Sequence, residues 1–450
     1  MKNVKNLSLF AITWPIFIEI LLHMLMGNAD TLMLSQYSDE SVAAVGVANQ
    51  ILFVIIVMFG FIATGTSVLV AQHLGAKENQ EAEEVSRVSI VGNLLFGLLL
   101  SVCLIVFGES ILQLMKLPRE LFAEAYGYLL IVGGFSFVQA LIMTMGAILK
   151  SNGYTRDTMY ITIGMNLLNV LGNYLFIFGP FGFPVLGVQG VAISTTVSRV
   201  LAMGVLFVLL LKRTSLSIRP SLWFPLPVRH VKNLLKIGIP SAGEHLSYTS
   251  SQMLIMYFIT MMGTEAITTR IYTQNIMMFI FLFGVAVSQG TQIIIGHLVG
   301  AKAFQEAYDR CLKSLKLAII VAIAMAIGVS MFSDTLFSIF TSNDHIIQTG
   351  GTLLLLTIIL EPGRSFNLVI INALRAAGDV KLPVYMGILS MWGLGVPISY
   401  FLGIEFGLGL IGIWIAFIID EWIRGLVMLW RWRTRVWEQK SFVKAELKIT

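Results

Sequence analysis

The chain has 450 residues, of which 56% are hydrophobic and only 12% are charged. A soluble domain of this size could not bury so much apolar surface, so lipid must be its main solvent. The formal net charge of +5 is distributed as a membrane-topology signal and not as a nucleic-acid footprint, so no nucleic-acid partner is expected.

Apolar stretches long enough to cross about 30 Å of hydrocarbon recur along the whole sequence. Helices are expected because β-barrel strands would show short alternating segments. In chain order we predict twelve transmembrane helices, at residues 9–34, 42–70, 86–108, 123–148, 158–178, 187–211, 233–261, 267–297, 311–332, 346–373, 381–403 and 409–430. The predicted fold class is therefore an all-α membrane protein with short connections.

The basic residues predict the orientation in the membrane. If the N-terminus is cytoplasmic, all but six of the 30 Lys and Arg residues lie on the inner side, as the positive-inside rule requires. The exceptions are Lys116, Arg119 and Arg270 outside and Arg199, Arg364 and Arg424 within spans. We therefore expect cytoplasmic termini. We also expect a multi-pass protein of the plasma membrane, the inner membrane of a bacterium, and one that acts as a monomer in the lipid bilayer.

The second half of the sequence repeats the first at a spacing of 225 residues, as from Pro15 to Pro240. The further pairs are Glu19 and Glu244, Gly65 and Gly290, Thr66 and Thr291, the Gly-Ala-Lys runs at 75–77 and 300–302, Gly153 and Gly378, Tyr160 and Tyr385, and Arg199 and Arg424. Because six predicted helices, an even number, precede the second repeat, the two repeats are parallel in the membrane.

Four parts follow from this repeat. We predict an N-terminal six-helix lobe at 1–211, a basic cytoplasmic linker at 212–232, a C-terminal six-helix lobe at 233–432 and a basic cytoplasmic tail at 433–450. A duplicated membrane protein is typically a transporter whose site lies between the repeats. The sequence has no nucleotide-binding loop or hydrolase motif, so neither an enzyme nor a resident cofactor is expected, and energy must come from a gradient.

The first predicted helix carries an acidic face. Glu19, His23 and Asp30 lie at i, i+4 and i+11, within roughly 40° of one stripe, since each residue turns a helix by about 100°. A charged side chain at the bilayer centre costs roughly 3 kcal/mol or more. We therefore expect this face to line an aqueous cavity.

Polar side chains on two later helices complement Asp30. Asn166, Asn169 and Asn173 share a stripe of the helix at 158–178, and the next helix offers hydroxyls that include Thr195. Carboxylate, amide and hydroxyl oxygens from three helices are suited to Na+ or a proton. The alternative is that the Asn and Thr residues only hydrogen-bond neighbouring helices.

The second repeat copies this arrangement incompletely. Glu244 repeats Glu19 and is followed by His245, with Tyr248 on the same face, but Ile255 stands where Asp30 would recur. A cation site around Asp30 is therefore expected in the first lobe alone. The equivalent helices 42–70 and 267–297 carry Gln50 and Asn275, which either line the cavity or serve in polar packing.

Two charged pairs lie in the last spans. Glu361 and Arg364 flank a Pro-Gly step, which removes a backbone hydrogen bond and is tolerated where the backbone lines a cavity. They either face that cavity or form a structural ion pair. Asp420 and Arg424 are spaced for an i, i+4 pair in the last helix.

At this point the sequence resembles the multidrug and toxic compound extrusion (MATE) transporters. The resemblance covers essentially the whole chain. It is carried by Asn-Ala-Asp-Thr around Asp30, the Gly-Ala-Lys runs, and Asn-Val-Leu-Gly-Asn-Tyr-Leu-Phe-Ile-Phe-Gly at 169–179. It implies two six-helix bundles that export organic compounds in exchange for Na+ or H+. It also implies a cation site at Asp30, Asn169, Asn173 and Thr195. Some branches carry a carboxylate where this chain has Asn173, so the resemblance leaves the coupling ion open.

The sequence thus predicts an antiporter that exports small organic, often cationic amphipathic compounds by alternating access. The residues expected to line its cavity or relay protons are Glu19, His23, Gln50, Glu244, His245, Tyr248, Asn275, Glu361 and Arg364. One alternative is a flippase for lipid-linked oligosaccharide or related polyprenyl-phosphate intermediates, which would favour a cavity rich in Arg and Lys. A channel and an intramembrane enzyme are weaker alternatives, since no repeated pore loop or zinc-protease motif is present.

Overall fold

A computed structural model describes residues 8–217 and 226–443, and every regular element in those ranges is a helix. The predicted all-α class is confirmed. Parts of the predicted linker and tail, residues 218–225 and 444–450, lie outside the described residues. The chain divides into two compact units, the first containing Ile18–Gly238 and the second containing the residues from Ile239 onward together with the start of α1. The predicted lobe boundaries remain predictions.

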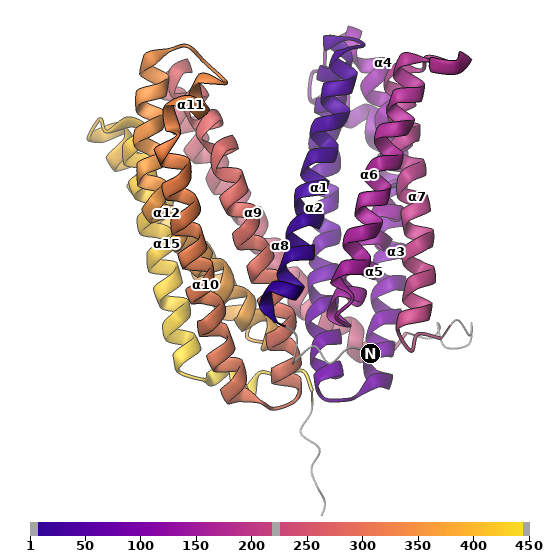
Figure 1. Cartoon of the computed structure of the whole chain (residues 1–450), viewed down its shortest axis with the longest axis vertical. Helices are drawn as coiled ribbons and strands as arrows, with labels where there is room; N and C mark the ends of the chain where they lie inside the picture. The colour runs from indigo at the N-terminus through magenta and orange to yellow at the C-terminus, as the bar shows by residue number, and fades with distance from the viewer. Residues whose placement is uncertain (1–7, 218–225, 444–450) are drawn as a thin grey trace, which may run out of the picture. The chain divides into compact units, whose positions relative to one another are not determined.

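The first half of the chain forms seven α-helices. They are α1 (Leu9–Ser35), α2 (Asp39–Gly75), α3 (Asn79–Leu114), α4 (Arg119–Tyr128), α5 (Ser136–Ser151), α6 (Thr155–Phe178) and α7 (Gly187–Arg213), with a π-helical turn η2 (Leu129–Gly133) after α4 and a 3-10 turn η3 (Pro180–Gly182) after α6. Within this unit α2, α3, α5, α6 and α7 pack side by side (Figure 1).

The second half has the same pattern of long helices. It contains α8 (Val228–Met261), α9 (Thr264–Gly300), α10 (Phe304–Met331), α11 (Ser333–Ser338), α12 (Asp344–Ala376), α13 (Lys381–Ser390), α14 (Val396–Tyr400) and α15 (Gly409–Arg433), with helical turns η5 (Met391–Gly395), η6 (Phe401–Glu405) and η7 (Val436–Gln439). Within this unit α12 packs against α9, α10 and α15.

Within the described residues, helix length and apolar composition identify fewer candidate membrane spans than the twelve predicted. Within residues 8–217 and 226–443, nine helical segments are long and apolar enough to cross a bilayer. The segment pair Arg119–Gly133 and Ser136–Ser151, bent by 43°, makes a tenth. The helices α8 and α15 are not among them, and both carry charged side chains along their length, Glu244 and Asp420 among them. The count of twelve therefore remains a prediction.

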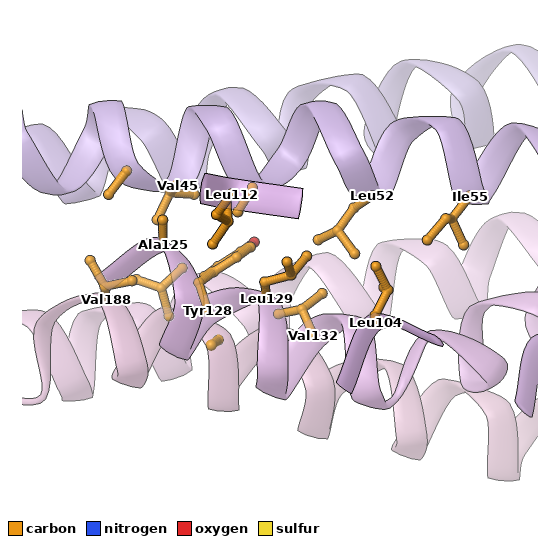
Figure 2. Packing of buried hydrophobic residues seen from close by; sticks show 14 of the residues in the cluster. Val45, Leu52, Ile55, Leu104, Leu112, Ala125, Tyr128, Leu129, Val132 and Val188 are labelled. Atoms are coloured by element: carbon orange, nitrogen blue, oxygen red, sulfur yellow. The ribbon is translucent and has the colours of Figure 1, made fainter. Parts of the chain in front are cut away.

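The first unit contains two clusters of buried apolar side chains, one of which is drawn in Figure 2. Figure 2 shows Leu52 and Ile55 of α2 facing Leu104 of α3 and Leu129 of η2, with Tyr128 beside them. Apolar residues alone do not drive helices together in lipid, so packing and the few polar contacts between helices hold this unit. One such contact is Asn93, whose amide donates to the Thr144 hydroxyl at 2.7 Å.

The repeated glycines mark where the first turns of α1 and α8 pack. Residues of α1 up to Phe17 belong to the second unit, and residues of α8 up to Gly238 belong to the first. A Cβ added at Gly290 would lie 2.6 Å from the Thr13 hydroxyl, and one added at Gly65 would lie 3.3 Å from the Leu234 side chain. Because glycine has no Cβ, Gly290 lets the start of α1 pack closely against α9, and Gly65 lets the start of α8 pack closely against α2.

The turns that follow equivalent helices have the same backbone conformation in the two repeats. Lys77 and Lys302, the last residues of the Gly-Ala-Lys runs, have φ values of 65° and 58°. Gly153 and Gly378 have φ values of 83° and 92°, a conformation that L side chains rarely adopt. The sequence repeat therefore preserves the backbone conformation of the turns as well as the helices.

Candidate cation site and the charged pairs of the two units

Asp30 lies buried between three helices of the first unit. Its Oδ1 accepts a 2.5 Å hydrogen bond from the Asn173 amide of α6. The Asn169 amide of the same helix donates to the Thr195 hydroxyl of α7 at 3.1 Å. Asp30 is 6% exposed, and the other three side chains are 1% exposed or less. The structure thus brings the four residues of the predicted cation site into one buried group.

This group contains oxygen atoms with no protein partner. The amide oxygens of Asn169 and Asn173 are buried and accept no hydrogen bond, and the side chain of Asn166 one turn earlier is also unpaired. A buried acceptor that stays unpaired costs about 1–3 kcal/mol. A carboxylate beside amide and hydroxyl oxygens is the donor set that hard cations prefer, so these residues fit Na+. They also fit a proton carried by the Asp30 carboxylate.

Three residues near Asp30 had no role predicted from the sequence, namely Asn49, Tyr128 and Arg199. The hydroxyl of Tyr128 is a hydrogen-bonding neighbour of Asn49 and Thr195, and Arg199 acts electrostatically on both Asp30 and Tyr128. Tyr128 comes from the predicted fourth span, where a tyrosine two residues after Tyr126 gives no signal of a polar site. The repetition of Arg199 as Arg424 was the available clue.

Glu19 and Glu244 are engaged in equivalent ion pairs. The Lys150 ammonium lies 2.8 Å from the Glu19 carboxylate, which also accepts a 2.8 Å hydrogen bond from Thr158. Arg375 pairs with Glu244 in the second unit, and residue 375 is the counterpart of residue 150 at the repeat spacing. Both acids were predicted to line a cavity, and no sequence pattern pairs either of them with these bases. Each carboxylate is neutralised by a base on the neighbouring helix.

A network of charged residues surrounds a cavity in the second unit. Arg364 lies 2.5 Å from Glu361 and 3.8 Å from Glu421, and Arg424 lies 2.7 Å from Asp420 and 3.3 Å from Glu421. The structural ion pair, one of the two readings of Glu361 and Arg364, is therefore present. The cavity is small, with a volume of about 40 Å³, and its polar lining includes Tyr248, Gln252, Gln274, Arg364, Asp420 and Arg424.

Gln50 and Asn275 are exposed, and the residue before each makes the contact. Asn49 reaches Tyr128 near Asp30, and Gln274 lines the cavity of the second unit. The two predicted roles of Gln50 and Asn275, lining a cavity or polar packing, remain predictions. The two remaining predicted residues, His23 and His245, are half-buried. His23 lies in the field of Glu19 and Lys150, and the ring of His245 lies 6.4 Å from that of Tyr248.

Comparison with known proteins gives consistent similarities along the whole chain. The sequence profile of the MatE family matches residues 15–175 and 240–401, one match in each repeat. The chain is 57% identical over 437 residues to the "Uncharacterized transporter YisQ" of Bacillus subtilis, covering 97% of this chain and 96% of that protein. It is 26% identical to the "Probable multidrug resistance protein NorM" of Thermotoga maritima, covering 98% and 94%.

Solved structures share the fold. An outward-facing MATE family transporter of the MOP superfamily superimposes with a TM-score of 0.87 at 21% identity, over 96% of both chains. At this identity the likeness concerns the helical architecture, and the arrangement of side chains around Asp30 has to be judged by its own geometry.

Proposed function

Since this chain belongs to the MatE family, the multidrug and toxic compound extrusion transporters, we propose that it is an antiporter that exports organic, often cationic amphipathic compounds in exchange for Na+ or H+. It is a multi-pass transport protein of the plasma membrane. The proposal concerns its coupling ion, its substrate class and the residues that couple the two. It involves no enzymatic step and no resident cofactor, and the protein acts as a monomer.

The buried group around Asp30 carries the proposal. Asp30 has the Asn173 amide at 2.5 Å, and the amide oxygens of Asn169 and Asn173 have no partner. In a membrane interior an ionised carboxylate is costly when no base contacts it directly, and Arg199 acts on Asp30 only at longer range. Binding of Na+ or H+ removes that cost, so occupancy by a cation changes the stability of this arrangement of α1, α6 and α7.

The coupling follows from this difference. An antiporter must favour different conformations when loaded with the ion and when loaded with the substrate. Asp30 lies on α1 and its partners lie on α6 and α7, so neutralising Asp30 alters the contacts among three helices of one unit. A conformation that releases the substrate is then favoured by ion binding, and loss of the ion to the cytoplasm resets the site.

The available energy is sufficient for useful export. One cation that moves down about 100 mV supplies about 2.3 kcal/mol. For a neutral substrate that energy sustains a gradient of about 40-fold, because each 1.4 kcal/mol corresponds to about a tenfold ratio. Exchange of one cation for a monovalent cationic substrate moves no net charge, so the concentration gradient of the ion drives that export.

The charges favour this proposal over a flippase. A flippase for a pyrophosphate-linked lipid needs Arg or Lys side chains that are free to bind phosphate. The two arginines that line the cavity of the second unit, Arg364 and Arg424, each contact carboxylates at 3.3 Å or less. Their charge is offset before any ligand arrives, so they offer no free basic group for a phosphate.

The test uses the full chain reconstituted in liposomes, with a sodium gradient and a pH gradient applied separately. Ethidium efflux should respond to one of them and should fall at least about tenfold in Asp30→Asn. Asp39→Asn, the same change at an exposed residue in the first turn of α2, is the matched control and should retain efflux. Gradient-driven efflux that survives Asp30→Asn would refute the assignment, and efflux that ignores both gradients would refute antiport.

A further inference from the structure

A second group of His and Glu side chains lies at the C-terminal end of α2. His73 is in the last turn of α2, Glu81 is in the first turn of α3 and His230 is in the first turn of α8. One nitrogen or oxygen atom from each lies within 4.8 Å of the corresponding atoms of the other two. All three residues belong to the first unit, and the transport proposal uses none of them.

His73 is held with one ring nitrogen directed for ligation. Its Nδ1 lies 2.7 Å from Oε2 of Glu78, so the proton of a neutral ring is drawn to that side. The Nε2 atom then carries the lone pair, and it is buried with no hydrogen-bond partner in a side chain that is 0% exposed. A carboxylate that fixes the tautomer of a histidine in this way is the usual outer partner of a metal-ligating imidazole.

His230 presents its Nε2 atom to two carboxylates. Oε2 of Glu81 lies 3.3 Å away and Oε2 of Glu84 lies 3.5 Å away. His230 is 1% exposed, and burial lowers the pKa of its imidazole, while the Glu81 carboxylate acts in the opposite direction. The two histidine rings are perpendicular, with centroids 6.0 Å apart.

The separation between His230 and Glu81 suits a tetrahedral ion. Bonds of about 2.0–2.1 Å place neighbouring ligand atoms of a tetrahedron about 3.3 Å apart, which is the separation between His230 Nε2 and Glu81 Oε2. The Glu81 and Glu84 side chains are 35% and 24% exposed, so an ion can reach the group from solvent. Arg229, whose Nη1 lies 3.6 Å from Glu81, is 45% exposed and free to turn outward.

We propose that His73, Glu81 and His230 bind one divalent transition-metal ion, preferably zinc, with Glu84 or water as the fourth ligand. Two imidazoles and a carboxylate are a zinc donor set, and a buried nitrogen without a partner is satisfied when the metal binds. The ion joins the start of α8 to α2 and α3. Because α8 continues into the second unit after Gly238, the metal anchors the segment through which the chain passes from one unit to the next.

The second repeat supplies a matched control. Glu306 is the counterpart of Glu81 at the repeat spacing and Asp309 that of Glu84, but the nearest histidine, His297, stands one residue earlier than the counterpart of His73. One residue corresponds to about 100° of helix rotation. The acids are therefore repeated without the aligned histidine, and Glu306→Gln should leave metal binding unchanged.

The experiment uses the purified full chain, carrying a cleavable tag without histidines and freed of metal by a chelator. Zinc is titrated by calorimetry, and Co²⁺ is added as a spectroscopic probe. We expect one metal per chain, the intense visible absorption of tetrahedral cobalt, and a rise in Tm of about 3–5 °C at saturating zinc. His230→Gln should weaken binding by at least about tenfold, and Glu81→Gln by about tenfold or more.

His73 is buried, so His73→Ala risks misfolding and is interpreted only if its Tm without metal matches that of the unsubstituted protein. His230→Gln keeps the proposal testable in any case. Absence of stoichiometric zinc binding would overturn the proposal. So would binding that His230→Gln leaves unchanged, or binding that Glu306→Gln weakens as much as Glu81→Gln does.

Discussion

The two units place equivalent arginines near acids that lie on different helices. In the first unit Arg199 of α7 lies in the field of Asp30, which comes from α1 and is hydrogen-bonded by an amide. In the second unit Arg424 of α15 pairs at 2.7 Å with Asp420 of the same helix. Residue 420 is the counterpart of Thr195 at the repeat spacing.

This difference distinguishes an acid in a structural ion pair, Asp420, from an acid that can respond to a coupling ion, Asp30. An acid and a base in direct contact, four residues apart on one helix, neutralise each other without reference to the rest of the fold. An acid held by amides from another helix stays responsive to a cation and to the positions of those helices. The duplicated chain has therefore kept the arginine in both units and changed which helix supplies the acid.

The largest expected effect is a contrast between the two acids. Asp420→Asn removes a carboxylate from Arg424, which retains Glu421 at 3.3 Å, so we expect a loss of stability of about 2–3 kcal/mol. Ion-driven efflux per folded molecule should stay within about threefold of the unsubstituted protein, whereas Asp30→Asn should reduce it at least about tenfold with little change in Tm. Thermal unfolding in detergent and liposome efflux measure the two quantities. Equal losses of coupling in the two variants would place the ion site in both units.

The repeated positive-φ glycines should differ in their tolerance of alanine. In Gly378→Ala the new Cβ would lie 2.2 Å from the Lys440 carbonyl oxygen, in addition to the strain of a φ value of 92°. We expect a loss of about 3 kcal/mol or more. Gly153→Ala, at a φ value of 83°, should cost about 1–2 kcal/mol through the strain of the left-handed conformation. Thermal unfolding of the two variants side by side tests this order, and a larger loss at Gly153 would contradict it.

The close contact between α9 and the start of α1 predicts a rescue. Gly290→Ala should destabilise by about 1–3 kcal/mol, because its Cβ would meet the Thr13 hydroxyl at 2.6 Å. Thr13→Ala removes that hydroxyl, so the double variant should recover most of the loss. Gly65→Ala, with its nearest contact at 3.3 Å, should have the smaller effect. If Thr13→Ala brings no recovery, α1 does not pack on α9 in this way.

The smallest expected effect concerns the repeated ion pairs. Single neutral substitutions of Glu244 and Arg375 should each destabilise, and the double variant should lose less than their sum, with a coupling energy of about 1 kcal/mol. The same cycle on Glu19 and Lys150 should give a similar value. Because both acids are already neutralised, Glu244→Gln should reduce export of cationic and neutral substrates alike. A loss confined to cationic substrates would show that Glu244 attracts the cargo.

Several features of the fold and site were accessible from the sequence because they depend on local pattern. Apolar runs of sufficient length predicted helices, and all the predicted ranges overlap helical segments of the structure. The buried group at Asp30 was predictable because a carboxylate in an apolar run is costly and has few possible partners. The asparagine stripe of α6 lies on one helix face and gave those partners directly.

Partners distant in sequence were not accessible in the same way. Lys150 and Arg375 lie near helix ends, where basic residues are explained by topology alone, so nothing in the sequence assigned them to Glu19 and Glu244. Asn49 had no predicted role, because the rotation of a helix about its axis cannot be fixed without knowing which helix packs opposite. The His73, Glu81 and His230 group joins three segments that no sequence spacing relates.

By itself the sequence determined an all-α membrane protein with an internal repeat, and it singled out Asp30 as the acid that the second repeat lacks. These conclusions follow from hydrophobicity, charge placement and self-similarity, which are properties of the chain alone. The tertiary structure decided which acids are neutralised and which oxygens remain unpaired, as at Glu19 and Asn169. The free energy of a buried charge or amide depends on the groups that packing brings within about 3 Å of it. Those groups come from distant parts of the chain, so no local sequence pattern identifies them.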